Sequence, residues 1–203
     1  MSGIDLVYKV GPQVNSDGAP VMGRADKEGA IVTNPSHGEY FEAARRGRIF
    51  YAANSAAQAV SVALATTYTG LVLSNPAGSG VDLSLLHVGV GLTLAPAAIA
   101  SLGLIGGWTA AGVTAHTTAL VPGGTYLGGA AGVGKADSAA TIPTPVWLDI
   151  LASGFTAAAL PSTSPVVLDK RGVWVVPPGG FLAIGALTAV TGFFSMLWEE
   201  VPR

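Results

Sequence analysis

The sequence predicts an all-β fold, either a sandwich or a barrel. Short strand-like segments alternate with turns rich in glycine and proline, and no helical period is sustained. Its 203 residues suit one domain with an arm. Between Arg48 and Lys135 the only charged side chain is Asp82. Strands so poor in charge indicate outer faces covered by small uncharged residues or by neighbouring subunits.

Residues 1–37 differ from everything that follows them. They combine glycines and prolines with mixed charges and few large apolar groups. This composition predicts an extended N-terminal arm that needs a neighbour to lie on, followed by a β domain over residues 38–203.

The segment HGEYFEAARRGRIFYAANS, residues 37–55, predicts a short helix that ends at Gly47. It carries the basic cluster of the chain: Arg45, Arg46 and Arg48. One interpretation is a solvated turn with local salt bridges. The other is that the arginines meet acidic groups on an adjoining protein.

Strand signals recur after this segment. A strand is expected near residues 65–73, a loop over 75–80, and then a longer strand in which every second residue is apolar. The alternation changes phase at Leu85 and Leu86, which indicates a β-bulge.

Further strands are expected up to the C-terminus. The string DKRG, residues 169–172, predicts a tight hairpin turn between strands at 166–168 and 173–176, and PPGG, residues 177–180, separates the next pair. Glu199 and Glu200 end the last strand and point to opposite faces. Their expected roles are to protect a sheet edge and to pair with a basic group such as Arg45 or Arg171.

Two apolar stretches raise the alternative of a small integral membrane protein. Residues 85–108 and 181–198 are long enough to cross a bilayer. Glycines, prolines and the period of two in the first stretch favour strands instead, so no membrane is expected as a partner.

The string GGAAGVGKADSA contains Gly129, Gly134 and Lys135 at the spacing of a phosphate-binding G-x-x-x-x-G-K loop. Ala136 stands where the motif needs a hydroxyl, and Pro143 follows before a helix could form. The string is therefore interpreted as a flexible loop between strands, and no nucleotide cofactor is expected.

Composition excludes several other classes of chemistry. The chain has no cysteine, so it has no disulfide, zinc–thiolate site or thiol nucleophile. A net charge of −2 predicts no nucleic-acid partner. His37, His87 and His116 belong to no metal-binding or catalytic motif. The expectation is a protein that is not an enzyme and has no cofactor and no metal.

Three blocks together resemble a known group of proteins: HGEYFEAARRGRIFYAAN, TGLVLSNPAGSGVDLSLLHVGVG, and the ending GVWVVPPGGFLAIGAL…GFFSMLWEEVP. They are similar to small structural proteins of tailed bacteriophages, over about residues 37–202. The resemblance implies a jelly-roll-like β-sandwich, often trimeric, that decorates or cements the capsid or forms a head or tail appendage.

The function expected from this resemblance is that of a capsid decoration or cement protein on the virion surface. Its partners would be copies of itself in a homotrimer and the major capsid protein or neighbouring virion proteins. Residues expected at subunit or capsid contacts are Arg45, Arg46, Arg48, Glu199 and Glu200. The alternative in the same class is a fibre or receptor-binding knob, with Trp108, Tyr126 and Trp147 as candidate contact residues.

Overall fold

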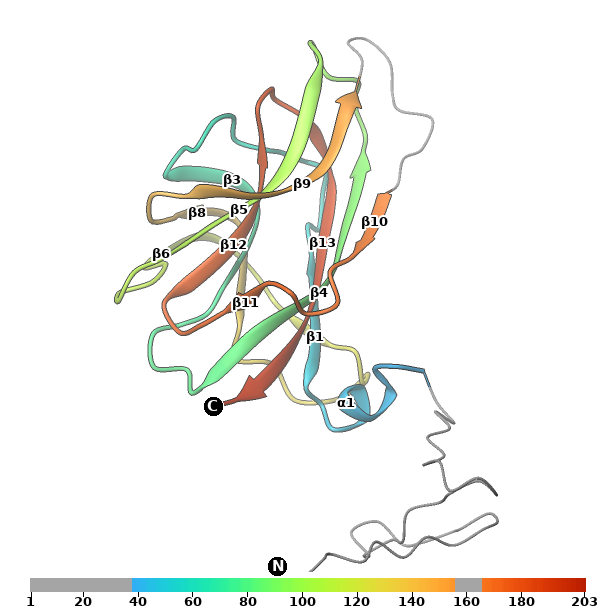
Figure 1. The fold of residues 1–203 in the computed structure, drawn as a ribbon, viewed down its shortest axis with the longest axis vertical. Coiled ribbons are helices and arrows are strands. Elements are labelled where there is room, and N and C mark those ends of the chain that lie inside the picture. Colours follow the sequence, from blue (N-terminus) through green and yellow to red (C-terminus); the bar gives the residue numbers. More distant parts are fainter. Residues whose placement is uncertain (1–37, 156–165) are drawn as a thin grey trace, which may run out of the picture. The chain divides into compact units, whose positions relative to one another are not determined.

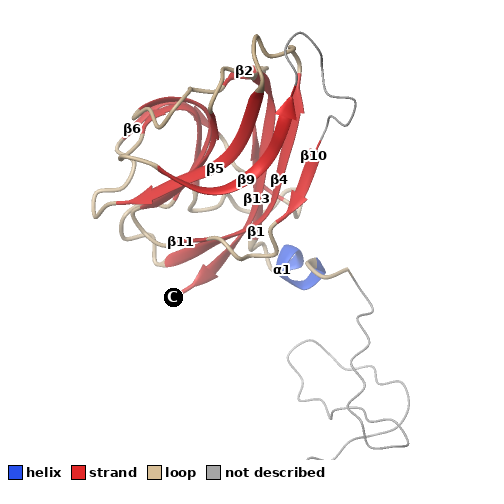
Figure 2. Ribbon diagram, turned by 45° about the horizontal axis from the view of Figure 1, so that its top comes forward, coloured by secondary structure: helices blue, strands red, loops and turns tan. Residues whose placement is uncertain are grey.

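The computed structural model describes residues 38–155 and 166–203, and the predicted arm at 1–37 lies outside these ranges. Residues 42–203 form one compact unit. Two antiparallel sheets face each other in it (Figures 1 and 2), so the predicted all-β sandwich is confirmed. The short helix α1 (Phe41–Arg45) precedes the first strand, and Gly47 ends it with a φ of 67°.

The first sheet has the strand order β10-β4-β13-β1-β7. Its members are β10 (Val166–Asp169), β4 (Val81–Leu92), β13 (Thr191–Pro202), β1 (Ile49–Ala53) and β7 (Gly123–Gly124), with β11 (Val175–Val176) paired to β4 and β2 (Gln58–Ala59) paired to β13. The second sheet has the order β6-β8-β3-β12-β5-β9. Its members are β6 (Ala115–Leu120), β8 (Lys135–Thr141), β3 (Thr67–Ser74), β12 (Gly180–Ala186), β5 (Ala100–Trp108) and β9 (Val146–Phe155).

Eight strands form four antiparallel pairs that nest along the chain. The innermost pair is β5 with β9, and β4 with β10, β3 with β12, and β1 with β13 enclose it in turn. Successive pairs alternate between the two sheets. Strands β6, β7 and β8 are inserted between β5 and β9, and they extend the β1 and β3 side of the sandwich. The opposite side ends in β9 and β10 (Figure 1).

The core lies between the sheets and follows from alternation along the central strands. Trp198, Phe194, Leu104 and Ile184 are fully buried in it. In β4, residues 85 and 86 are both buried, and the register with β13 shifts at this point. The bulge predicted from the two consecutive leucines is confirmed.

The predicted hairpin at 169–172 is wrong. Strands β10 and β11 both pair with β4, one after the other, and not with each other, and the turn between them stays hydrogen-bonded to β4. Lys170 N and Gly172 N donate to the carbonyl oxygens of Leu86 and Leu85. A local turn signal is compatible with a hairpin and with an irregularity between two segments that pair with the same strand. The pairing with β4 shows that the second arrangement is the one present.

The predicted edge role of the last strand is also wrong. Strand β13 lies between β4 and β1, at the centre of the first sheet, so Glu199 and Glu200 protect no edge. The two apolar stretches considered as membrane spans are divided among strands: residues 85–108 supply β4 and β5, and 181–198 supply β12 and β13. In the described ranges, no helix is long and apolar enough to cross a membrane.

Candidate functional site

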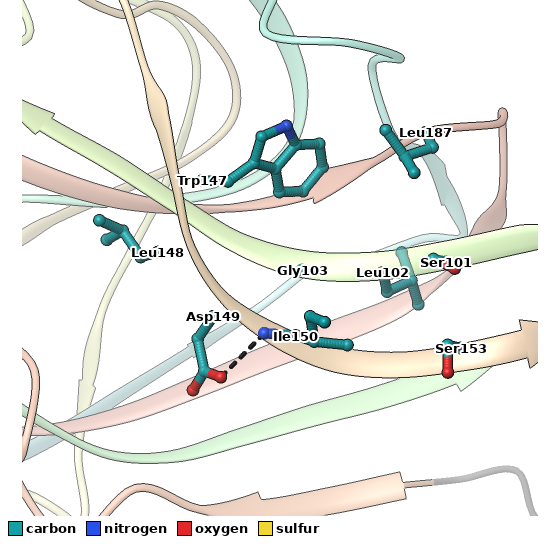
Figure 3. A pocket seen from close by; sticks show the side chains of 9 residues that line it. All are labelled: Ser101, Leu102, Gly103, Trp147, Leu148, Asp149, Ile150, Ser153 and Leu187. Atoms are coloured by element: carbon teal, nitrogen blue, oxygen red, sulfur yellow. Dashed lines mark hydrogen bonds between the residues drawn. The ribbon is translucent and has the colours of Figure 1, made fainter.

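An apolar groove of about 430 Å³ lies at the β5–β9 side of the second sheet (Figure 3). Strand β9 pairs with β5 along this side, and three register shifts place extra residues in β9 opposite β5. Ile150 is 74% exposed and Leu187 is 64% exposed. The lining residues are Ser101, Leu102, Gly103, Trp147, Leu148, Asp149, Ile150, Ser153 and Leu187.

The Trp147 ring is seated on a floor of two glycines. Gly103 in β5 and Gly185 in β12 are register partners, and a Cβ atom on either would lie within 3.0 Å of the indole. The absence of both side chains lets the ring lie close to the sheet while 40% of the residue stays exposed. The glycines therefore fix the position of the aromatic wall of the groove.

Gly185→Ala is expected to move the Trp147 ring away from the sheet. The new methyl group would meet Ile105 Cγ2 at 2.6 Å and the indole at 2.9 Å, which costs about 1–3 kcal/mol of unfolding free energy. Tryptophan fluorescence should change in this variant and stay unchanged when the variant is made in a Trp147→Phe background. Gly124→Ala is the control, because its Cβ would have no neighbour closer than 3.5 Å. Equal stabilities of the two variants would contradict the prediction.

The one carboxylate that lines the groove, that of Asp149, is paired with a lysine. Lys170 Nζ donates to Asp149 Oδ2 at 2.7 Å, and Ile150 N donates to the other carboxylate oxygen. The hydrogen bond from Lys170 lowers the pKa of Asp149 below its usual range. The bridge also joins β9 to the residue after β10, and so ties the two sheets at this side. Three valines in or near β10 and β11 are also exposed: Val167, Val173 and Val175.

The structure brings together only some of the residues predicted as contacts. Arg45 and Arg46 are exposed around the end of α1. Arg48 Nη2 instead bonds Glu199 Oε1 at 2.6 Å within the chain. The sequence had suggested Arg45 or Arg171 as the basic partner, and the partner is Arg48.

Glu200 points to the opposite face and is 7% exposed. Its carboxylate accepts hydrogen bonds from Val133 N at 3.0 Å and Gly134 N at 2.8 Å, and Trp198 Nε1 lies 3.5 Å away. The glycine-rich string that resembled a phosphate loop therefore binds an anion through its backbone, but the anion is the protein's own glutamate. Strand β8 begins at Lys135, inside the string, where a phosphate-binding loop would lead into a helix.

Neither His87 nor His116 lines the groove, and His37 lies outside the described residues. His116 Nδ1 on β6 hydrogen-bonds the buried Asp137 Oδ2 on β8 at 2.7 Å, whereas His87 Nδ1 lies 4.0 Å from Asp169. Burial raises the pKa of the Asp137 carboxyl above its usual range, against the opposing effect of the His116 bond. Among residues 38–155 and 166–203, no three His, Asp or Glu side chains gather as metal ligands.

Three exposed aromatic residues had been singled out as possible receptor contacts. Trp108 ends β5, Tyr126 lies in the loop before β8, and Trp147 lies on β9. Only Trp147 lines the groove. The other groove residues were missed, because the register shifts that open it depend on pairing between β5 and β9.

Comparison with family models, curated proteins and solved structures found no match for this chain. Its function is therefore inferred from its own residues and geometry.

Proposed function

We propose that this chain is a non-enzymatic structural protein of a tailed-bacteriophage virion, a decoration or cement protein that acts as a homotrimer on the capsid surface. The observation that carries the proposal is the apolar groove at Trp147 and Ile150 on the β9 side of the sandwich, whose one carboxylate, Asp149, is paired with Lys170. Exposed apolar patches of this kind are typical of protein interaction sites.

We further infer that the sandwich is a jelly roll. The nested pairs, from β5 with β9 out to β1 with β13, alternate between two sheets. This is the arrangement of eight strands in two Greek keys, which is frequent in viral capsid proteins. On this interpretation β2, β11 and the inserted strands β6 to β8 are additions to an eight-stranded body.

The proposed mechanism is physical. The sandwich seals junctions between capsid subunits, and several weak contacts from one trimer add up to tight binding. The exposed Arg45 and Arg46 supply positive charge beside the start of the domain. Residues 1–37, which would lie across the major capsid protein, are outside the described residues.

The proposal is tested on purified particles from the virus that carries this sequence. Quantitative mass spectrometry should find the protein on the particles, at a fixed ratio to the major capsid protein. Its absence from particles that are otherwise complete would overturn the proposal.

Removal of residues 1–36 is expected to abolish shell binding and leave a folded oligomer, because residues 42–203 are compact by themselves. Co-sedimentation with shells lacking the protein measures binding, and circular dichroism with light scattering measures fold and size. Unchanged occupancy of the shells would contradict the role given to the arm.

The fibre or receptor-binding knob is the second candidate, favoured by the exposed rings of Trp108 and Tyr126. It predicts a few copies at one vertex or at the tail instead of a lattice. Electron microscopy of particles labelled on this protein separates the two positions.

A further inference from the structure

The loop at residues 121–134, which includes the two-residue strand β7, presents apolar side chains that the described part of the chain leaves exposed. It holds no charged residue, yet Val121 is 90% exposed and Leu127 is 84% exposed. Tyr126 beside them is also exposed. Soluble proteins rarely leave such a cluster bare unless it has a partner.

This loop is held at both ends. Thr125 N donates to Ile49 O at 2.9 Å, and Gly129 N closes a turn on Tyr126 O at 2.9 Å. On the other side of the turn, Glu200 binds the amides of residues 133 and 134. A tip fixed in this way loses little conformational entropy when it binds, so its apolar side chains are well suited to docking.

The groove beside Trp147 lies at the other side of the sandwich. Strand β7, within this loop segment, ends the first sheet on the β1 side, whereas β9 and β10 end the two sheets on the opposite side. The shifts in β9 disturb the regular hydrogen-bonding edge that an added strand would need. An occupant is therefore expected to insert side chains into the groove instead of extending the sheet.

The two surfaces match in chemistry. Neither offers an unpaired charge, since the loop has none and the Asp149 carboxylate is bonded to Lys170. Because they lie on different sides of one chain, they cannot meet within it, but they can meet between copies in a head-to-tail contact. Repetition of such a contact forms a ring when the rotation between copies closes.

We propose that Tyr126 and Leu127 of one copy dock into the groove of Trp147, Ile150 and Leu187 of the next copy. The inference rests on the homo-oligomer of the proposed function and names its interface. It gives the inserted segment between β5 and β9 a role in assembly.

Cysteine crosslinking tests the contact cleanly, because the chain has no cysteine. L127C and I150C are purified separately and mixed so that their subunits exchange. The mixture is then oxidised. We expect a disulfide-linked dimer in the mixture that exceeds any product of either variant alone. The double variant should give covalent oligomers that end at the trimer. L94C replaces I150C as the control, since Leu94 is also exposed but lies outside the groove.

A second measurement does not depend on disulfide geometry. L127D and I150D should each dissociate the oligomer in sedimentation, with unchanged circular dichroism, because both side chains are exposed in the single chain. No enrichment over the control, or oligomers that survive both aspartates, would overturn the contact. Presence of the protein on particles without this crosslink would leave the proposed function standing and reject only the interface. Formation of the crosslink by a protein that is absent from particles would support the interface and reject the proposed function.

Discussion

Replacing Glu200 with alanine will lower the free energy of unfolding by about 3–5 kcal/mol. The carboxylate is buried and accepts hydrogen bonds from the backbone amides of Val133 and Gly134. Without it, both amides lose their acceptor, and the amide of Gly134 is buried, so the loop must either bear this cost or leave the sandwich. Urea denaturation measures the loss, and hydrogen exchange at residues 132–134 should rise far more than exchange in β4.

The adjacent Glu199 is the matched control. Its bond to Arg48 is shorter, at 2.6 Å, but both side chains are partly exposed to water. Glu199→Ala is therefore expected to cost about 1 kcal/mol or less. Equal losses for the two glutamates would mean that the loop is not held by the Glu200 carboxylate.

Asn75→Ala is expected to cost about 3 kcal/mol. The buried Asn75 Nδ2 donates to Val81 O in β4 and Val176 O in β11, both at 2.8 Å. The Asn75 backbone meanwhile bonds Gly179 and Gly180 at the start of β12. One residue thus ties the two sheets together at this end, and its loss leaves two carbonyl groups without their donor.

Asn54→Ala gives the comparison for this prediction. Asn54 is also buried, and its Oδ1, like that of Asn75, has no hydrogen-bond partner among the described residues. Its Nδ2 donates once, to Gly70 O at 3.1 Å. About half the cost of Asn75→Ala is therefore expected in thermal or urea unfolding. A larger effect at Asn54 would refute the assignment of Asn75 as the main tie between the sheets.

Local sequence signals predicted the features of the fold that depend on neighbouring residues. The alternation of apolar residues predicted β4, and the consecutive leucines at 85 and 86 predicted its bulge. Gly47 predicted the end of α1. The DKRG string misled because a turn signal does not specify the partner strand. Only the long-range pairing of β10 and β11 with β4 decides that question.

The sequence indicated some of the residues that make important contacts, but it did not indicate which groups they bond. Arg48 and Glu199 were singled out as contact residues, and the structure joins them to each other. The partners of Glu200 are backbone amides, which every residue carries, so no side-chain pattern reveals them. Asp149 and Lys170 meet across two sheets because β9 and β10 end on the same side.

The nesting of strand pairs has a consequence for how the chain folds. The innermost pair, β5 with β9, is separated by the whole inserted segment, so even the first pairing must close a long loop. The outermost pair joins Ile49 to Glu199 across nearly the entire domain. Folding dominated by such distant contacts is slow, on the order of milliseconds to seconds. During that time the apolar faces of β4 and β12 are open to other chains, so synthesis at high concentration favours aggregation over correct closure.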